Sequence, residues 1–207
     1  MDIDYKLINN VKGFLDEKEG RYLYEIAKEA SKIGPCLEIG SYCGKSTIYI
    51  GTACREESGI LFSIDHHRGS EEQQPDQEYF DPELYDSHAC RVDTFKTFRE
   101  TIETAGLEDT VVPIVCRSDV AAQLWATPLS LVFIDGGHSR EDVLTDYNSW
   151  AQHIIPEGYL AIHDIFKDPD KGGQAPCHIY KLALATGLFR ELSMVKTLAV
   201  LQMTDDG

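Results

Sequence analysis

The sequence predicts an α/β protein with a doubly wound sheet, mostly parallel, that carries an antiparallel strand at its C-terminal end. Two observations lead to this prediction. Short apolar runs alternate with helical stretches along most of the chain, and strands that are apolar throughout are typical of a parallel sheet covered on both faces. Most of these runs also end in polar residues, which would gather at the carboxyl edge of such a sheet.

The first unit begins with an amphipathic helix over residues 20–33, because apolar side chains recur there at helical spacing. Gly34 and Pro35 follow it, as expected at a helix end. The apolar run 36–39 is the first expected strand, and residues 46–53 are apolar enough for the next helix. The residues between that strand and helix therefore form a turn.

Four further strands follow in the same rhythm. They are expected at residues 60–64, 111–115, 129–134 and 159–162. The helices between them are expected at residues 91–105 and 140–154, and a Pro-Glu-Gly turn at residues 156–158 precedes the last strand. Residues 192–203 would supply one or two antiparallel strands. The length suits one domain over residues 1–207.

One segment interrupts the alternation. Residues 66–90 are acidic, polar and poor in aliphatic side chains. An irregular connection of this length in a compact domain is usually functional or disordered. We expect a lid or a substrate-binding loop, in which the acidic and aromatic part at residues 76–86 closes over a bound molecule.

The charge of the chain restricts its partners. The sequence has 19 Lys and Arg residues against 35 Asp and Glu residues, a formal net charge of −16. A protein that binds a phosphate backbone needs a basic face, and so does one attracted to an anionic membrane surface. We therefore expect no nucleic acid and no membrane as partner, a cytoplasmic location, and a small molecule as ligand. A homodimer is left open as the assembly.

Cysteine usage agrees with a reducing compartment. The six cysteines contain no C-x-x-C pair, and several lie in apolar stretches where a free thiol behaves as a small hydrophobe. Reduced thiols are therefore expected, with neither a disulfide nor a zinc site. The six are Cys36, Cys43, Cys54, Cys90, Cys116 and Cys177.

The first turn, EIGSYCGKST at residues 38–47, leaves three ligands to consider. A phosphate-binding P-loop has four residues between its glycines, whereas Gly40 and Gly44 are separated by three. A dinucleotide-binding loop needs G-x-G-x-x-G, and its middle and final glycines are absent here. In favour of a P-loop, residues 129–135 look like a strand that ends in a magnesium-binding acid.

Glu38 favours the third kind of ligand. A carboxylate two residues before the loop would repel a triphosphate, but it suits an amino group or sugar hydroxyls. Lys45 is then better explained as a solvated residue of the first helical turn than as a phosphate ligand.

Residues 38–46 resemble motif I of the class I S-adenosylmethionine-dependent methyltransferases, E/D-x-G-x-x-x-G-x-S. The resemblance extends over about residues 33–165. It includes the stretch FIDGGHSREDVLTDYNSWAQHIIPEGYLAIHD, which is similar to the branch of catechol and macrolide sugar O-methyltransferases. The resemblance implies a Rossmann-like fold, S-adenosylmethionine as cofactor, and methyl transfer to a small-molecule acceptor, at a hydroxyl oxygen.

The resemblance also implies a set of cofactor-binding positions. In that family the first glycine of motif I lets the backbone approach the methionyl part, and the acid that ends the second strand holds the ribose hydroxyls. The polar pair after the third strand faces the adenine, and the acid of the fourth strand lies near the reacting centre. The residues expected to bind the cofactor here are Glu38, Gly40, Ser41, Tyr42, Gly44, Ser46, Asp65, His66, Ser118, Asp119 and Asp135.

Two arrangements could take the proton of the acceptor. His138 and Asp135 are the expected catalytic residues, with the imidazole as general base; a simple helix-start histidine is the other interpretation of His138. The metal-dependent groups carry an acid after the fourth strand and an acid-containing pair after the fifth. Asp135, His163 and Asp164 match those positions, and this donor set suits a divalent transition metal better than magnesium. Alternatively, His163 and Asp164 hydrogen-bond the cofactor or the lid.

Two other functions stay open at this point. One is a P-loop-like ATP-dependent kinase or NTPase, which predicts affinity for ATP. The other is a catalytically silent domain that binds S-adenosylmethionine without transferring its methyl group.

Overall fold

A seven-stranded sheet organises the residues that the computed structural model describes, which are residues 3–137 and 139–204. Its strand order is β5-β2-β1-β6-β7-β9-β8. The first five of these strands pair in parallel, whereas β9 pairs antiparallel with both β7 and β8. The predicted fold class is confirmed, including the antiparallel C-terminal part. The strands are β1 Cys36–Ile39, β2 Leu61–Ile64, β5 Val111–Ile114, β6 Leu129–Ile134, β7 Ile154–Ile162, β8 Phe189–Val195 and β9 Leu198–Met203.

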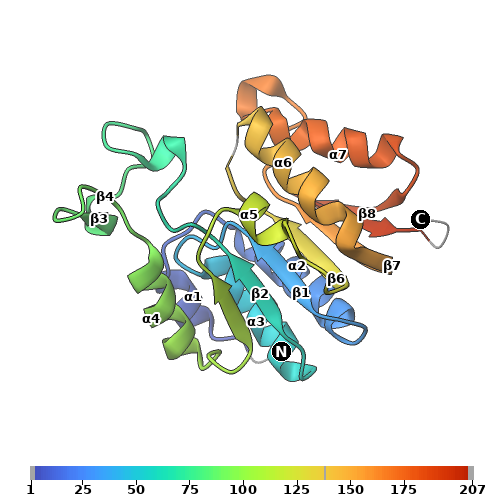
Figure 1. Cartoon of the computed structure of the whole chain (residues 1–207), viewed down its shortest axis with the longest axis horizontal. Coiled ribbons are helices and arrows are strands. Elements are labelled where there is room, and N and C mark those ends of the chain that lie inside the picture. The colour runs from blue at the N-terminus through green and yellow to red at the C-terminus, as the bar shows by residue number, and fades with distance from the viewer. Residues whose placement is uncertain (1–2, 138, 205–207) are drawn as a thin grey trace.

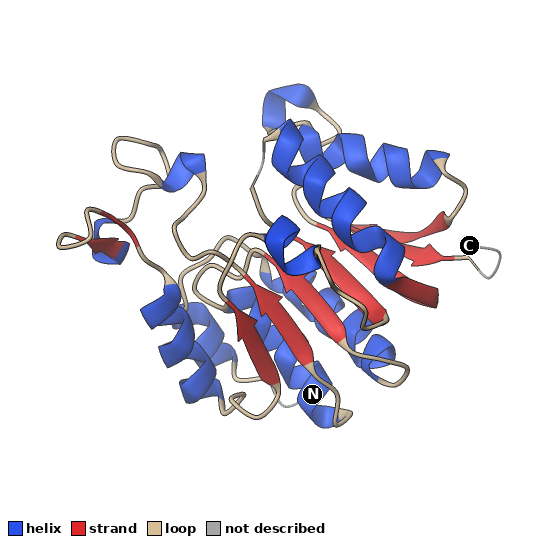
Figure 2. Ribbon diagram, in the orientation of Figure 1, coloured by secondary structure: helices blue, strands red, loops and turns tan. Residues whose placement is uncertain are grey.

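Helices cover both faces of the sheet (Figure 1 and Figure 2). One apolar core forms where α1, α2, α3 and α4 pack on one face, and a second forms under α5, α6 and α7 on the other. The helices are α1 Tyr5–Asn10, α2 Glu17–Ser31, α3 Lys45–Glu56, α4 Phe95–Ala105, α5 Ser118–Ala122, α6 Arg140–Trp150 and α7 Ala175–Ala185.

Helix α2 is held closely against α3. Asp16 caps its N-terminus, and Glu19 completes the capping box by accepting a hydrogen bond from the Asp16 backbone N–H. A Cβ atom added at Gly20 would lie 2.3 Å from the ring of Tyr49 on α3. The contact therefore requires glycine at this position, which places the start of α2 beside the first strand-to-helix unit.

The structure differs from the expectation around residues 150–162. Helix α6 ends at Trp150, a short 3-10 helix η3 (Ala151–His153) follows, and β7 already begins at Ile154. The expected turn at residues 156–158 is instead an irregularity within β7, where the pairing register with β6 shifts and Glu157 has a φ of 64°. Proline lacks the N–H that regular pairing needs, so a bulge accommodates it inside a strand.

The segment expected to be a lid has little regular structure. It carries two 3-10 turns, η1 (Glu71–Gln73) and η2 (Pro82–Leu84), and a two-stranded hairpin of β3 (Tyr85–Asp86) and β4 (Arg91–Val92). It projects beyond the sheet between β2 and α4 (Figure 1). We call residues 66–94 the insertion. In the described part of the chain, no helix is both long and apolar enough to cross a membrane.

Candidate functional site

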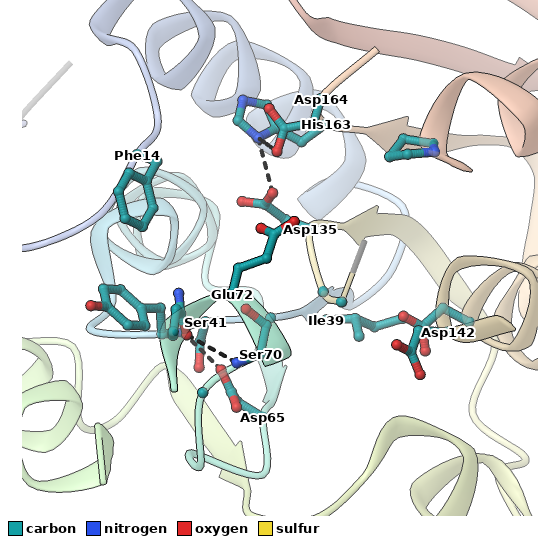
Figure 3. Close-up of a pocket in the computed structure, with 18 of the residues that line it drawn as sticks. Phe14, Ile39, Ser41, Asp65, Ser70, Glu72, Asp135, Asp142, His163 and Asp164 are labelled. Carbon is teal, nitrogen blue, oxygen red and sulfur yellow. Dashed lines mark hydrogen bonds and ion pairs between the residues drawn. The ribbon is translucent and has the colours of Figure 1, made fainter. Parts of the chain in front are cut away.

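A cavity of about 600 Å³ lies at the carboxyl edge of the parallel strands. Residues that follow β1, β2, β6 and β7 line it, as do parts of the insertion and of the segment before α2. Figure 3 shows Asp65 on one side and Asp135 on the other, with Glu72 pointing from the insertion toward Asp135. This is the edge where open parallel sheets bind their ligands.

The first loop needs its two glycines for different reasons. Gly40 has a φ of 90°, and a Cβ there would lie 2.2 Å from the carbonyl oxygen of Asp135. Gly44 caps α3 with a φ of 93°, a left-handed conformation that disfavours other residues. The loop therefore runs in direct contact with the end of β6, so that the first and fourth parallel strands of the chain contribute to one wall.

Ser41 is the clearest sign of a ligand in this loop. It lines the cavity and is only 2% exposed, and its hydroxyl has no hydrogen-bond partner among residues 3–137 and 139–204. Buried hydroxyl groups are nearly always hydrogen-bonded. The Ser41 hydroxyl is thus suited to a polar group of a molecule bound in the cavity.

Glu38 lies behind the loop and not in the cavity. It is fully buried, and its carboxylate accepts hydrogen bonds from Ser46 Oγ at 3.0 Å, from Ser63 Oγ at 2.8 Å and from the Thr47 hydroxyl. Burial raises the pKa of Glu38 to about 7, although the three hydroxyl donors oppose this shift. We call these four residues the first-loop cluster. Their hydrogen bonds tie β1 and β2 to the start of α3, which positions the loop.

Asp65 connects the first loop to the turn after β2. Its Oδ2 accepts a hydrogen bond from the backbone N–H of Tyr42 at 2.8 Å, and its Oδ1 accepts one from the N–H of His67 at 2.6 Å. His66, beside it, also lines the cavity. Figure 3 shows Asp65 next to Ser41 and Ser70 at the base of the cavity.

The polar pair after β5 has partners that the sequence did not indicate. Ser118 donates its hydroxyl hydrogen bond to Asp146 on α6, and Asp119 pairs with the guanidinium of Arg117 at 2.9 and 3.0 Å. Asp146 is buried and also lines the cavity. Burial raises its pKa to about 6.

A chain of charged groups leads from the cavity into the interior at the end of β7. His163 Nδ1 lies 2.9 Å from Asp135 Oδ1 and 3.5 Å from Asp164 Oδ2, and His163 Nε2 lies 3.1 Å from Glu19 Oε2. His163 and Glu19 are 5% and 3% exposed. We call these four residues the strand-end cluster; Figure 3 shows three of them.

The electrostatics of the strand-end cluster favour an ion pair. Burial lowers the pKa of His163, but the carboxylates of Asp135, Asp164 and Glu19 outweigh it, and the net shift is upward. For Glu19, burial raises the pKa, but hydrogen bonds from His163 and Thr197 outweigh it, and the net shift is downward. His163 is therefore a protonated imidazole held between carboxylates.

The N-terminal segment holds the insertion over the cavity. Lys12 Nζ lies 2.5 Å from Asp81 and 2.6 Å from Glu83. The ring of Phe14 packs edge-to-face on Tyr79 with centroids 5.3 Å apart. Phe14 is nevertheless 64% exposed, and both aromatic residues line the cavity. The mouth of the cavity is thus partly aromatic.

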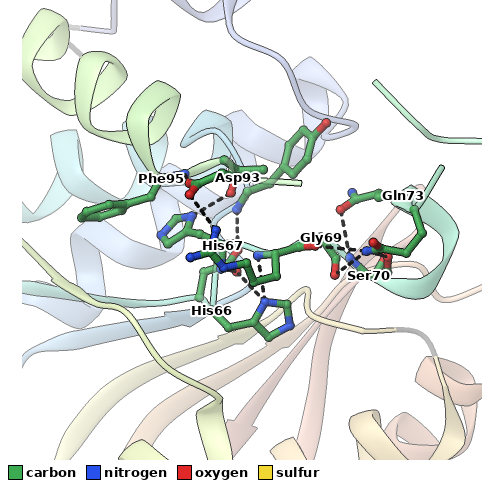
Figure 4. Close-up of polar contacts among 12 residues, drawn as sticks. His66, His67, Gly69, Ser70, Gln73, Asp93 and Phe95 are labelled. Carbon is green, nitrogen blue, oxygen red and sulfur yellow. Dashed lines mark hydrogen bonds and ion pairs between the residues drawn. The ribbon is translucent and has the colours of Figure 1, made fainter. Parts of the chain in front are cut away.

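Both ends of the insertion are anchored at His67. The imidazole is 2% exposed, its Nδ1 lies 2.8 Å from Thr94 Oγ1, and its ring packs against Phe95 and Phe98 of α4 at 5.0 and 5.1 Å. Figure 4 shows His67 and Phe95, together with the turn at Gly69 and Ser70. The insertion therefore leaves and re-enters the domain at a fixed point.

Most of the residues predicted from the sequence meet in this cavity. Those that line it are Gly40, Ser41, Tyr42, Ser46, Asp65, His66, Ser118, Asp119, Asp135, His163 and Asp164. Glu38 and Gly44 do not line it but shape the loop, and His138 lies outside the described residues. Sequence reasoning missed Lys12, Phe14, Glu19 and Asp146. For Asp146 a signal existed, because it is an acid on the buried face of α6 beside Tyr147.

Comparison with known proteins agrees with this architecture. A family model described as a methyltransferase domain matches residues 37–165. The structure is similar to that of an O-methyltransferase from Bacillus cereus in complex with SAH (TM-score 0.67, 14% identity, 98% of this chain and 92% of that chain covered). It is also similar to the O-methyltransferase TomG from Streptomyces achromogenes, involved in tomaymycin synthesis and solved with SAM (TM-score 0.64, 15% identity, 92% and 82% covered). At such identities the structural likeness shows a shared fold.

Proposed function

The chain belongs to the methyltransferase domain family, and we propose that it transfers the methyl group of S-adenosylmethionine (SAM) to a hydroxyl oxygen of a small-molecule acceptor. The observation that carries this proposal is the cavity at the carboxyl edge, whose first loop presents the buried, unpartnered hydroxyl of Ser41. The O-methyltransferases with this fold, one solved with SAM and one with SAH, support the same cofactor.

We propose that the two sides of the cavity bind different parts of the cofactor. Gly40 and Ser41 would hold the methionyl part, where the loop passes close to β6. Asp65 would hold the ribose: each of its oxygens already accepts one N–H, and each keeps a lone pair for a hydroxyl. Ser118 and Asp119 border the cavity where the adenine would lie.

The P-loop alternative is not favoured. The matching family is one of methyltransferases, and Lys45 Nζ donates a hydrogen bond to the carbonyl oxygen of Gly13 at 3.1 Å. A P-loop lysine binds phosphate instead. A catalytically silent cofactor-binding domain is the second candidate, and turnover of an acceptor separates it from an enzyme.

In the proposed reaction, the acceptor oxygen forms a bond to the methyl carbon while the bond from that carbon to sulfur breaks, leaving SAH. The protein contributes alignment and exclusion of water, and the insertion would close over the acceptor. The proton of the acceptor hydroxyl must pass to a base. Asp135 borders the cavity and is one candidate; His138, outside the described residues, stays the other.

The residues after β6 and β7 fit a divalent transition metal. Asp135, His163 and Asp164 each offer one ligand atom, and these atoms lie within 4.8 Å of one another. To bind such an ion, His163 would have to give up its Nδ1 proton; it would then bind through Nδ1 while its Nε2–H stays on Glu19, which is how metal-bound histidines are commonly held. Such an ion would polarise the acceptor hydroxyl. Activity that survives chelation, with an empty site by metal analysis, would remove this role.

Calorimetric titration with S-adenosylhomocysteine and with ATP tests the proposed function. We expect S-adenosylhomocysteine to bind and ATP not to bind. Binding of ATP without binding of S-adenosylhomocysteine would overturn the proposed methyltransferase function. Replacing Asp65 with Ala should weaken cofactor binding by about 1–3 kcal/mol, the cost of unpaired hydrogen-bonding groups. Unchanged affinity would remove the ribose role of Asp65.

The remaining proposals concern the class of acceptor, the location and the assembly. A net charge of −16 favours a small-molecule acceptor over nucleic acid. We also propose a cytoplasmic location and, as the assembly to be tested by light scattering, a homodimer.

A further inference from the structure

Glu19 reaches the site from outside the region that the family model matches. It lies in the first turn of α2, whereas the match begins at residue 37. Its carboxylate is 3% exposed and receives four hydrogen bonds. Oε1 accepts from the N–H and the hydroxyl of Thr197 at 2.8 and 2.7 Å, and Oε2 accepts from Asp16 N at 3.3 Å and His163 Nε2 at 3.1 Å.

These contacts determine how the His163 ring is oriented. Because Nε2 donates to Glu19, Nδ1 lies on the side of the ring that faces the cavity, 2.9 Å from Asp135 Oδ1. A half-turn of the ring would place a carbon atom against the buried carboxylate and remove its hydrogen bond. The carboxylate would keep its other three hydrogen bonds, but it would lose its one charged partner, which is costly at a buried site. The orientation of His163 therefore depends on Glu19.

The orientation of His163 in turn holds Asp135. The Asp135 carboxylate borders the cavity, where the reacting groups would meet, and its Oδ1 is bound by Nδ1. Phe133 packs against the same imidazole with centroids 6.3 Å apart, so the ring has a fixed apolar neighbour. A three-residue connection thus runs from helix α2 to the cavity wall.

We propose that Glu19 is a positioning residue for methyl transfer, which acts by holding His163 with its Nδ1 directed at Asp135 and Asp164. Glu19 does not line the cavity, so its effect would pass entirely through His163. The inference rests on the proposed function of the site. It applies equally whether Nδ1 donates its N–H to the carboxylates or, without that proton, would bind a metal ion, because Nε2 is bound to Glu19 in both cases.

A purely structural role is the competing explanation, since Glu19 also joins α2 to the turn between β8 and β9 through Thr197. The chain offers a matched control for it. Thr197→Val removes the hydroxyl that bonds Oε1 and leaves the bond between Oε2 and His163 in place. A structural role predicts that Thr197→Val and Glu19→Ala lower turnover alike.

The experiment compares the wild-type protein with Glu19→Ala, Glu19→Gln and Thr197→Val. Long-range proton–nitrogen NMR reports whether His163 Nε2 carries a hydrogen-bonded proton, calorimetry gives S-adenosylhomocysteine affinity, and steady-state kinetics gives kcat and KM. We expect Glu19→Ala to lose the protected Nε2–H signal and to lower kcat by about 10- to 100-fold, the range typical when the hydrogen-bond partner of a metal-binding histidine is removed. Cofactor affinity should not change. Glu19→Gln keeps an accepting oxygen and should recover part of kcat, and Thr197→Val should behave as wild type.

Three results would overturn the inference. They are a wild-type Nε2–H signal in Glu19→Ala, an unchanged kcat in that variant, and an equal loss of kcat in Thr197→Val. If Glu19→Ala does not fold, Glu19→Gln decides: a weakened Nε2–H signal together with a reduced kcat and a native melting transition supports positioning, whereas a reduced kcat with a wild-type signal overturns it. If the wild-type protein fails to bind S-adenosylhomocysteine, the proposed function falls instead, while the NMR comparison still decides whether Glu19 orients His163.

Discussion

The first-loop cluster and the strand-end cluster each contain a buried glutamate near the same edge of the sheet, yet the pKa values of the two carboxyl groups are shifted in opposite directions. Glu38 is fully buried and its pKa is raised to about 7. Glu19 is 3% exposed and its pKa is lowered. Glu38 lies deeper in the protein than Glu19, but solvent exposure alone does not explain a difference in the direction of the shift.

The partners explain it. Glu38 is surrounded by three neutral hydroxyl groups, which satisfy hydrogen bonds but supply no charge, so the cost of burying a carboxylate prevails. Glu19 receives an N–H from an imidazole that two further carboxylates keep protonated. The first arrangement suits a rigid support for a loop, and the second keeps charged groups at the cavity wall.

Of the changes considered, removal of His163 should have the largest effect on stability, because it takes away the charged partner that distinguishes Glu19 from Glu38. In His163→Leu, Glu19 stays buried without its cationic partner, and breaking one side of a buried pair costs about 3–5 kcal/mol. Urea unfolding measures the loss. The double variant Glu19→Leu with His163→Leu removes both charges and should be more stable than His163→Leu alone. If His163→Leu lowered the free energy of unfolding no more than an ordinary surface substitution does, the description of His163 and Glu19 as a buried ion pair would be contradicted.

The pH dependence of stability sharpens the other side of the comparison. Because the pKa of Glu38 rises from 4.5 to about 7 on folding, the folded state holds this proton more tightly than the unfolded state. Its contribution to stability is therefore most favourable below about pH 4.5, falls as the pH rises to about 7, and is constant above that. At about 1.4 kcal/mol per unit, the shift amounts to about 3 kcal/mol.

Glu38→Gln tests this contribution, because the amide cannot ionise. Urea unfolding at about pH 5 and at about pH 8 gives the stability lost between the two pH values, and this loss should be smaller for Glu38→Gln than for the wild type. The difference between the two proteins cancels the other titrating groups. Parallel pH profiles would show that Glu38 has no raised pKa.

The ion pairs between Lys12 and the insertion should give the smallest effect on stability. Lys12 is 32% exposed and pairs with Asp81 and Glu83, and such pairs contribute at most about 1 kcal/mol. Lys12→Ala should instead speed proteolysis within the insertion and raise the KM for the acceptor, because the N-terminal segment no longer holds the insertion over the cavity. Lys96→Ala, which removes a 3.9 Å pair on α4, is the matched control. Equal proteolysis rates in the two variants would contradict this role.

Much of the fold was predictable because its signals are local. The runs 36–39 and 129–134 are apolar except at Glu38 and Ser130, and they became β1 and β6 with the expected bounds. Helix α7 was missed: it is rich in apolar residues, and in the structure part of its surface packs in the core beside α6. The prediction of a turn at residues 156–158 was wrong, because the proline lies in a bulge within the long strand β7 and does not precede the strand.

The site was predictable in part for the same reason. Residues next to strand ends, such as Asp65 and Asp135, occupy the cavity because parallel strands bring their carboxyl ends to one edge. Glu38 is also near the end of a strand, but its side chain points away from the cavity, toward the hydroxyl groups of the first-loop cluster. Nothing in the sequence next to Glu38 indicates whether its side chain points into the cavity or away from it.

By itself, the sequence determined the order of the five parallel strands, several of the helices between them, the glycine loop after the first strand and the family to which the chain is similar, because periodicity and short motifs act over neighbouring residues. Only the tertiary structure decided that Glu19 reaches His163, 144 positions away in the chain, and that Asp146 faces Ser118. It also decided that Lys12 and Phe14 border the cavity. These relations depend on how separate elements pack, and packing sets both the partner of each buried carboxylate and the direction of its pKa shift.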